Sequence, residues 1–144
     1  MSTTPDPALV PQQSLTVDGF RNWEIVCAIT TEGDATRAEQ LARALLERGL
    51  AGCVSLIPLR SLYVWNGQLE HSAEVQLLIK TTPARLKALH QAVLELHSYD
   101  TPMWVQWQAQ ADGGYGAWLA RVTAHPGAPP PAGADSPGNG DPAG

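Results

Sequence analysis

The chain has 144 residues, 44% of them hydrophobic, and a formal net charge of −5. This length and apolar content suit a single domain with a sizeable core. The negative charge gives no attraction for nucleic acid or anionic membranes, and no apolar run is long enough to span a bilayer. The first residues lack the pattern of a secretory signal, and two cysteines are too few for a disulfide framework. We therefore expect a cytosolic protein with reduced thiols.

Both ends of the chain are expected to lie outside the folded unit. Residues 1–22 contain three prolines and no sustained periodicity, and predict a flexible leader. Residues 124–144 are rich in proline and glycine and cannot bury enough apolar surface to offset the entropy lost on ordering. They predict a disordered tail, with a proline-rich ligand segment as the alternative. The domain is expected to span residues 23–123.

The first half of this domain reads as a strand followed by a helix. Residues 24–30 form a short apolar run, which suits a central strand covered on both faces. Asp34 can cap a helix that extends to Arg48, and Gly49 is a natural stop after it. The apolar stripe of this helix consists of Ala38, Leu41, Ala42, Leu45 and Leu46.

A long hairpin is predicted next. Two strand-like runs flank Asn66-Gly67, a pair that accepts the positive φ angles of a type I′ turn. The second arm alternates, so one face carries Val75, Leu77 and Ile79, and the other carries Glu74, Gln76 and Lys80.

The remainder predicts a helix, a strand and a short helix. Thr82 can cap the first helix, with Pro83 at its first position. Its apolar positions are Leu86, Leu89, Val93 and Leu96. Residues 102–108 read as the last strand, and residues 114–122 as a closing helix with Trp118 and Leu119 packed inward.

The predicted order is that of a ferredoxin-like α+β fold, βαββαβ plus a C-terminal helix, with an antiparallel sheet. The hairpin arms are longer than a small sheet needs, and overhanging strands must be paired or covered. Large aromatic side chains are available for such a contact, and the candidates for it are Trp65, Trp104 and Trp107. Together these features predict a homo-oligomer formed by strand pairing between subunits.

Five motifs resemble those of the CutA family of divalent-cation tolerance proteins, in the family's order and spacing. They are Leu50-Ala-Gly-Cys-Val-Ser-Leu-Ile-Pro58, Ser61-Leu-Tyr-Val-Trp-Asn-Gly67, Glu74 through Lys80-Thr81, His97-Ser-Tyr99 with Thr101-Pro102, and Tyr115 with Trp118-Leu119. The resemblance implies a very stable cytoplasmic homotrimer associated with tolerance to divalent cations such as copper. It also implies kinship to the PII signalling trimers, which bind small ligands in clefts between subunits.

The chain departs from the family pattern at three positions. Met103 replaces a usual glutamate, Gln108 replaces a usual proline, and Ser98 replaces the proline of a His-Pro-Tyr motif. The loss of the glutamate removes a carboxylate from a strand that lines the cleft. Any ligand or metal site that needs this charge is weakened.

The resemblance also suggests a metal site. In some members a cysteine at the position of Cys27, with histidines just after the second helix, is linked to copper. Cys27 and His97 match, but the adjacent second histidine is Leu96. Thiolate and imidazole suit copper, although two protein ligands make a weak site. Alternatively, Cys27 and Cys53 are small buried apolar residues, and His97 complements the C-terminal end of a helix.

The candidates for an inter-subunit cleft are Tyr63, Glu70, Glu74, Lys80 and Tyr99. Glu74 and Lys80 share one face of a strand but lie roughly 20 Å apart, so each needs a partner from elsewhere. An interfacial role in ion pairs and hydrogen bonds is the alternative to ligand binding, and aromatic packing between subunits is the alternative to ligand stacking.

No enzyme motif is present, neither a nucleophile elbow, a phosphate-binding glycine loop nor a zinc-protease helix. We therefore expect a protein that is not an enzyme. Three functions compete: a metal-associated tolerance protein, a regulatory trimer that senses a small molecule, and a structural or anchoring trimer that docks partners on its surface.

Overall fold

The computed structural model describes residues 13–15 and 21–124, which form one sheet and three α-helices. The elements in chain order are β1 (Gln13–Leu15), β2 (Arg21–Glu32), α1 (Ala35–Glu47), β3 (Cys53–Trp65), β4 (Gln68–Thr81), the 3₁₀ turn η1 (Pro83–Arg85), α2 (Leu86–Leu96), β5 (Val105–Asp112) and α3 (Gly113–Val122).

The sheet is antiparallel and its main strands lie in the order β5-β2-β4-β3. One edge of β2 pairs with β5, and the other edge pairs with β4 from Val26 to Glu32. The short β1 pairs with the first three residues of β2. The predicted ferredoxin-like arrangement is confirmed, and β1 is an addition that the sequence did not indicate.

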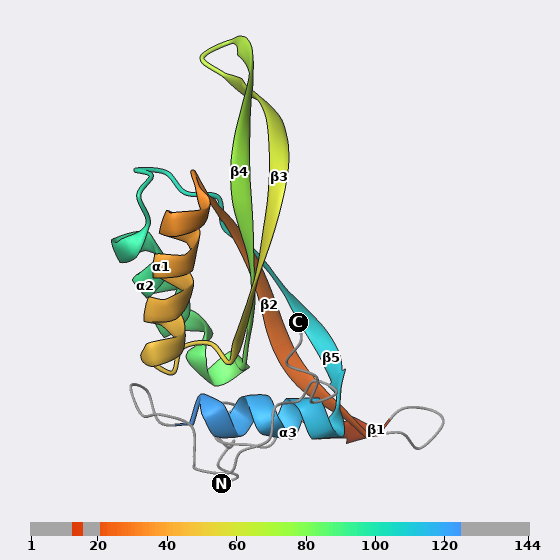
Figure 1. Cartoon of the computed structure of the whole chain (residues 1–144). Helices are drawn as coiled ribbons and strands as arrows, with labels where there is room; N and C mark the ends of the chain where they lie inside the picture. Colours follow the sequence, from red (N-terminus) through yellow and green to blue (C-terminus); the bar gives the residue numbers. More distant parts are fainter. Residues whose placement is uncertain (1–12, 16–20, 125–144) are drawn as a thin grey trace, which may run out of the picture.

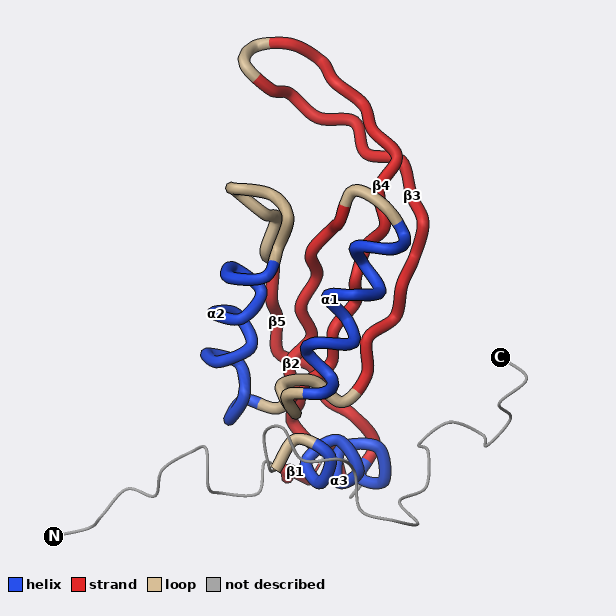
Figure 2. Tube along the Cα trace, turned by 60° about the vertical axis from the view of Figure 1, so that its left-hand side comes forward, coloured by secondary structure: helices blue, strands red, loops and turns tan. Residues whose placement is uncertain are grey.

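The helices cover the sheet unequally (Figure 1). α1 and α2 pack on one face, whereas α3 lies across the start of β2 and the end of β5 (Figure 2). The core lies between the sheet and the first two helices, and its fully buried members include Ala28, Leu45, Leu77, Ile79, Leu89 and Val93. The opposite face of the sheet, which we call the open face, carries the alternate residues. Consecutive residues of β2 are buried at two places, Ile25–Val26 and Thr30–Glu32, so the strand is covered on both faces there.

The predicted helix start and hairpin turn are confirmed in detail. The Asp34 side chain accepts a hydrogen bond from the backbone N–H of Arg37 at 2.8 Å, which caps α1. Asn66 and Gly67 have φ values of 51° and 74°, as a type I′ turn requires. The expected alternation of β4 is present, with Val75, Leu77 and Ile79 buried.

The last strand begins and ends later than the sequence predicted. It spans Val105–Asp112 rather than residues 102–108. Trp104 packs partly buried against the core and stacks on His90, with ring centroids 4.7 Å apart, so this part of the chain does not join the sheet. The strand continues because backbone pairing with β2 extends to Asp112. The sequence pattern carries no signal for this pairing.

The second helix also starts differently. Thr82 has the extended backbone of an N-cap residue, but its side chain makes no capping hydrogen bond. The segment Pro83–Arg85 forms a 3₁₀ turn before the α-helix begins at Leu86. At the other end, Leu96 is more exposed than its place in the predicted stripe implied.

Half of the hairpin projects beyond the sheet, as both figures show. Pairing of β4 with β2 ends at Val75, so residues 59–74 pair only with each other. This segment, here called the outer hairpin, exposes large apolar side chains: Leu62, Val64, Trp65 and Leu69. An isolated two-stranded hairpin is at best marginally stable in water. By itself, then, the outer hairpin would be only marginally stable.

The proposed domain limits stay predictions. The leader and the tail fall mostly outside the described residues, although Gln13–Leu15 within the leader forms β1. Among the residues that are described, no helix is long and apolar enough to cross a membrane.

The close approach of α3 to β2 gives a first prediction. A Cβ atom at Gly116 would overlap Trp23, whereas at Gly114 its nearest neighbour would be Asp112 Oδ2 at 3.5 Å. Gly116→Ala should therefore lower the free energy of unfolding by about 1–3 kcal/mol, the usual range for overpacking. Gly114→Ala should be neutral or stabilising by up to about 1 kcal/mol. Urea unfolding of both variants measures this, and equal stabilities would show that α3 does not pack as described.

Candidate functional site

A buried carboxylate lies where β2 ends. Glu32 is only 2% exposed and accepts hydrogen bonds from the backbone N–H of Ser98 at 3.1 Å and from the Ser98 hydroxyl. The backbone N–H of Gly33 also donates to it, at 3.3 Å. Burying a carboxylate is costly unless such donors compensate for lost water. Proline, which the resemblance gives as usual at position 98, could supply neither Ser98 donor.

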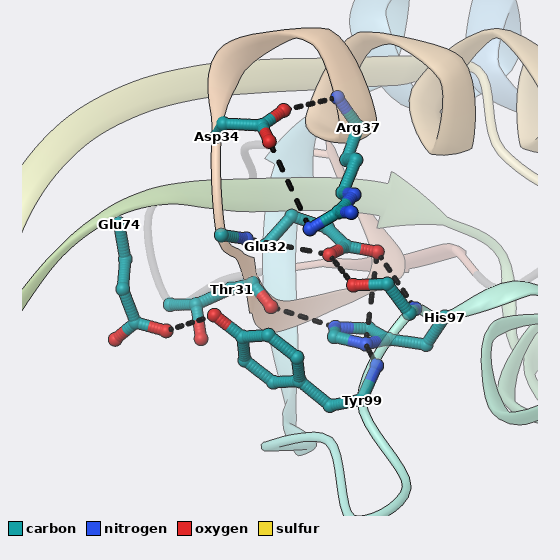
Figure 3. A network of polar contacts seen from close by, with 9 residues as sticks. Thr31, Glu32, Asp34, Arg37, Glu74, His97 and Tyr99 are labelled. Carbon is teal, nitrogen blue, oxygen red and sulfur yellow. Dashed lines mark hydrogen bonds and ion pairs between the residues drawn. The ribbon is translucent and has the colours of Figure 1, made fainter.

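His97 connects the same loop to β2 (Figure 3). Its Nε2 lies 2.6 Å from the carbonyl oxygen of Thr31, and its Nδ1 accepts a hydrogen bond from the backbone N–H of Tyr99 at 2.9 Å. A carbonyl can only accept and an N–H can only donate, so the proton is on Nε2 and the ring is neutral. Both ring nitrogens are occupied by protein groups. His97 therefore holds the loop in place and leaves no lone pair free for a metal.

Tyr99 carries this network to the hairpin. Its hydroxyl donates to Glu74 Oε2 at 3.0 Å (Figure 3). Partial burial, followed by this hydrogen bond and the charge of Glu74, raises the pKa of Tyr99 to about 12. Two of the five predicted cleft residues are thus in direct contact at the base of the outer hairpin.

The other three predicted cleft residues lie elsewhere. Tyr63 and Glu70 are directly opposite each other in the outer hairpin. Lys80 lies at the far end of β4, where its Nζ donates to Ser55 Oγ at 3.2 Å and is 3.9 Å from Cys53 Sγ. Within one chain these residues do not form a single cleft.

Cys27 and His97 are not brought together. Ala28 faces α1 and α2, so the neighbouring Cys27 faces the open side of the sheet, whereas His97 contacts the carbonyl of Thr31. Burial raises the pKa of the Cys27 thiol, and the nearby Lys80 charge partly opposes this. In the described part of the chain, no group of three or more His, Cys, Asp or Glu residues is arranged to hold a metal ion.

The three tryptophans predicted at an interface differ in their surroundings. Trp65 in the outer hairpin and Trp107 on the open face are exposed. Trp104 instead packs against the protomer's own core. Met103 and Gln108, two of the departures from the family pattern, are also exposed.

A hollow of about 260 Å³ lies beside the Glu32 network. It is lined by Glu32, Arg37, Gln40, Leu41, Ala44, Leu96 and Ser98. The sequence did not point to Glu32 as a site residue; its only signal was an acidic residue at the end of an apolar strand.

The comparisons with known proteins agree with this architecture. The CutA1 divalent ion tolerance protein family matches residues 26–122. The chain belongs to this family. It is 42% identical over 98 residues to the divalent-cation tolerance protein CutA of Pectobacterium atrosepticum, covering 67% of this chain and 89% of that protein. It is 35% identical over 100 residues to the divalent-cation tolerance protein CutA of Thermococcus kodakarensis, covering 69% of this chain and 96% of that protein.

Solved CutA structures superpose on the described domain. CutA from Synechococcus elongatus PCC7942 matches with a TM-score of 0.68 and 34% identity, over 69% of this chain and 90% of that one. A CutA from Archaeoglobus fulgidus, described as a periplasmic divalent cation tolerance protein, matches with a TM-score of 0.67 and 26% identity. The match covers 69% of this chain and 98% of that chain.

The Tyr99–Glu74 bond predicts a pH dependence. Because the pKa of Tyr99 is raised from 10.0 to about 12 in the folded protein, its contribution to stability is complete below pH 10. That contribution is lost as the pH rises toward 12, since the unfolded chain then ionises first. The difference in tyrosinate absorbance between the wild type and Tyr99→Phe should titrate near pH 12. A midpoint at the ordinary tyrosine value would exclude the hydrogen bond in solution.

Proposed function

We propose that this protein is a homotrimer that acts in divalent-cation tolerance and binds copper weakly, without catalytic activity. The observation that carries this proposal is the outer hairpin, an exposed apolar arm on a domain of the CutA1 family. The relatives are named for divalent-cation tolerance, which supports the assigned role. A cytoplasmic location remains part of the proposal.

Trimer formation would bury the apolar side chains that the outer hairpin exposes in a single chain. Leu62, Val64, Trp65 and Leu69 are each at least 60% exposed in a single chain. Leu62, Val64 and Leu69 project from one face of the arm, and Trp65 projects from the other. Large apolar side chains exposed together in this way mark an interaction site. Among the described residues, β3 and β5 are the outermost strands of the main sheet, and an outer strand can pair with a strand of another chain. A neighbouring subunit that pairs with the hairpin would bury these side chains and Trp107.

A trimer would also bring together groups that a single chain keeps apart. Tyr63 and Glu70 near the hairpin tip could contact Glu74, Tyr99 or Lys80 of a neighbouring subunit. We propose that these residues line the contact between subunits. Ion pairs and hydrogen bonds across that contact would then add to the stability of the assembly.

Copper binding would depend chiefly on Cys27. A soft thiolate suits copper, and the half-buried position limits access by water. His97 could join as a second ligand only by giving up its hydrogen bond to Tyr99 or Thr31. This cost, together with the absence of a third ligand among the described residues, supports weak binding.

The metal proposal predicts the effect of removing its ligands. Reduced, metal-free protein is titrated with Cu(I) without oxygen, against a chromogenic competitor. Cys27→Ser should lower the affinity at least about tenfold, equivalent to about 1.4 kcal/mol. His97→Gln should have a smaller effect. Cys53→Ser is the matched control, and equal affinity in all four proteins would remove Cys27 from the site.

The assembly proposal predicts the effect of charges on the outer hairpin. Leu62→Lys combined with Leu69→Lys should convert the trimer into monomers, because lysines cannot be buried there without partners. Leu94→Lys is the control, since Leu94 is 51% exposed on α2, away from the hairpin. Light scattering after gel filtration measures the mass. A wild-type mass equal to that of one chain would refute the trimer.

A second candidate function is small-molecule sensing. The hollow beside Glu32 combines a buried carboxylate and the Arg37 guanidinium with apolar walls, which favours a small polar ligand. A thermal-shift screen of nucleotides and metabolites tests this, because a ligand that binds only the native state raises Tm. A third candidate is an anchoring trimer that docks partners through its leader or tail. Because removal of residues 1–22 would also delete β1 and the start of β2, the truncation is limited to residues 1–12 and 125–144. An anchoring trimer would then lose its partners, whereas the first two functions would survive.

A further inference from the structure

A row of chemically reactive side chains crosses the open face of the sheet. Lys80 of β4 lies directly opposite Cys27 of β2 on one side and Cys53 of β3 on the other. Residues directly opposite in antiparallel strands project from the same face with Cβ atoms about 4.5–5.5 Å apart. The neighbouring Ala28 and Ile79 face the helices, so the row points the other way. One amine therefore lies between two thiols.

The contacts of Lys80 are unusual for a lysine. Its Nζ is 3.9 Å from Cys53 Sγ and donates to Ser55 Oγ at 3.2 Å. Among the described residues, no carboxylate forms an ion pair with it. The side chain thus leans toward β3, beside the Cys53 thiol. Tyr115 of α3 lies near the same thiol, and its pKa is raised by burial and then by Cys53.

The two thiols cannot bond to each other within the chain. Cys27 and Cys53 are two strands apart, which places their Cα atoms roughly 9–10 Å apart. A disulfide needs Cα atoms within about 7 Å. Lys80 also lies between them. An oxidised Cys53 would therefore meet the Lys80 amine before it met another thiol of its own chain.

We propose that Cys53 and Lys80 form a reversible nitrogen–oxygen–sulfur crosslink when the protein is exposed to dioxygen. Lys80 first releases its ammonium proton to solvent. The S–H bond of Cys53 and one N–H bond of Lys80 then break, and one S–O bond and one N–O bond form. The second oxygen atom leaves as water with the two hydrogens. Sulfur and nitrogen together lose four electrons, which dioxygen accepts, so atoms and electrons balance.

The crosslink would covalently join two neighbouring strands at the base of the long hairpin. It joins β3 to β4 near the base of the long hairpin, just before β4 leads into η1. It also consumes a thiol and a positive charge beside Cys27. Oxidation would thus produce a covalent change on the open face that a thiol reductant reverses. This inference does not rest on the proposed copper binding.

The test uses the full chain, reduced under argon and then kept in air-saturated buffer. Crosslinking adds one oxygen and removes two hydrogens, so the intact mass should rise by about 14 Da, whereas sulfenic acid adds about 16 Da. After denaturation, trypsin should no longer cut after Lys80, and peptides 49–60 and 61–85 should be recovered as one species. Dithiothreitol should restore the mass and the cleavage. This readout needs no variant.

Matched variants identify the two atoms. Lys80→Arg keeps the positive charge and Cys53→Ser keeps the size, and both should abolish the mass gain. Cys27→Ser should retain it. The inference is overturned if oxidised wild type carries only sulfenic or sulfinic acid on Cys53, if no mass change occurs, or if the gain of about 14 Da persists in Lys80→Arg.

Discussion

The pairing of β2 with β4 is the constraint on which the rest of the structure depends. β2 spans Arg21–Glu32, and its last partner in β4 is Val75. Because β4 continues outward to Gln68, seven of its residues extend past the sheet with only β3 beside them. The same register places Glu32 at the buried end of β2, and Cys27 opposite Lys80. The length of β2 and its register with β4 thus determine where the outer hairpin begins, where the polar network forms, and that Lys80 lies between Cys27 and Cys53.

The polar network and the hairpin are physically connected. Glu32 and His97 fix the loop after α2, and this loop presents Tyr99 to Glu74 at the point where the hairpin leaves the sheet. A buried network with its main donors and acceptors paired is rigid and favours one conformation. The buried part of the network fixes the loop, and the exposed Tyr99–Glu74 hydrogen bond links this loop to the base of the arm. This suits an element whose apolar side chains must meet a neighbouring surface.

The proposed metal site and the proposed crosslink lie on opposite sides of Lys80 on the open face. Cys27 is the thiol best placed for copper in the proposed function, and Cys53 is the thiol nearest the Lys80 amine. Lys80 influences both, since its charge opposes the rise in the Cys27 pKa that burial causes. Copper at Cys27 and oxidation at Cys53 would therefore act on either side of Lys80, on β2 and β3 with β4 between them. Exposure of this face in the assembled protein would decide which of them has access.

The sequence by itself determined the order of the main elements, the cap at Asp34 and the turn at Asn66-Gly67, because local periodicity and backbone preference fix these features. The tertiary structure alone decided that β5 extends to Asp112, that Trp104 packs in the core, and that His97 belongs with Glu32 rather than with Cys27. These outcomes depend on register and side-chain direction between segments distant in sequence. A pattern within one segment holds no information about which face of another segment it will meet.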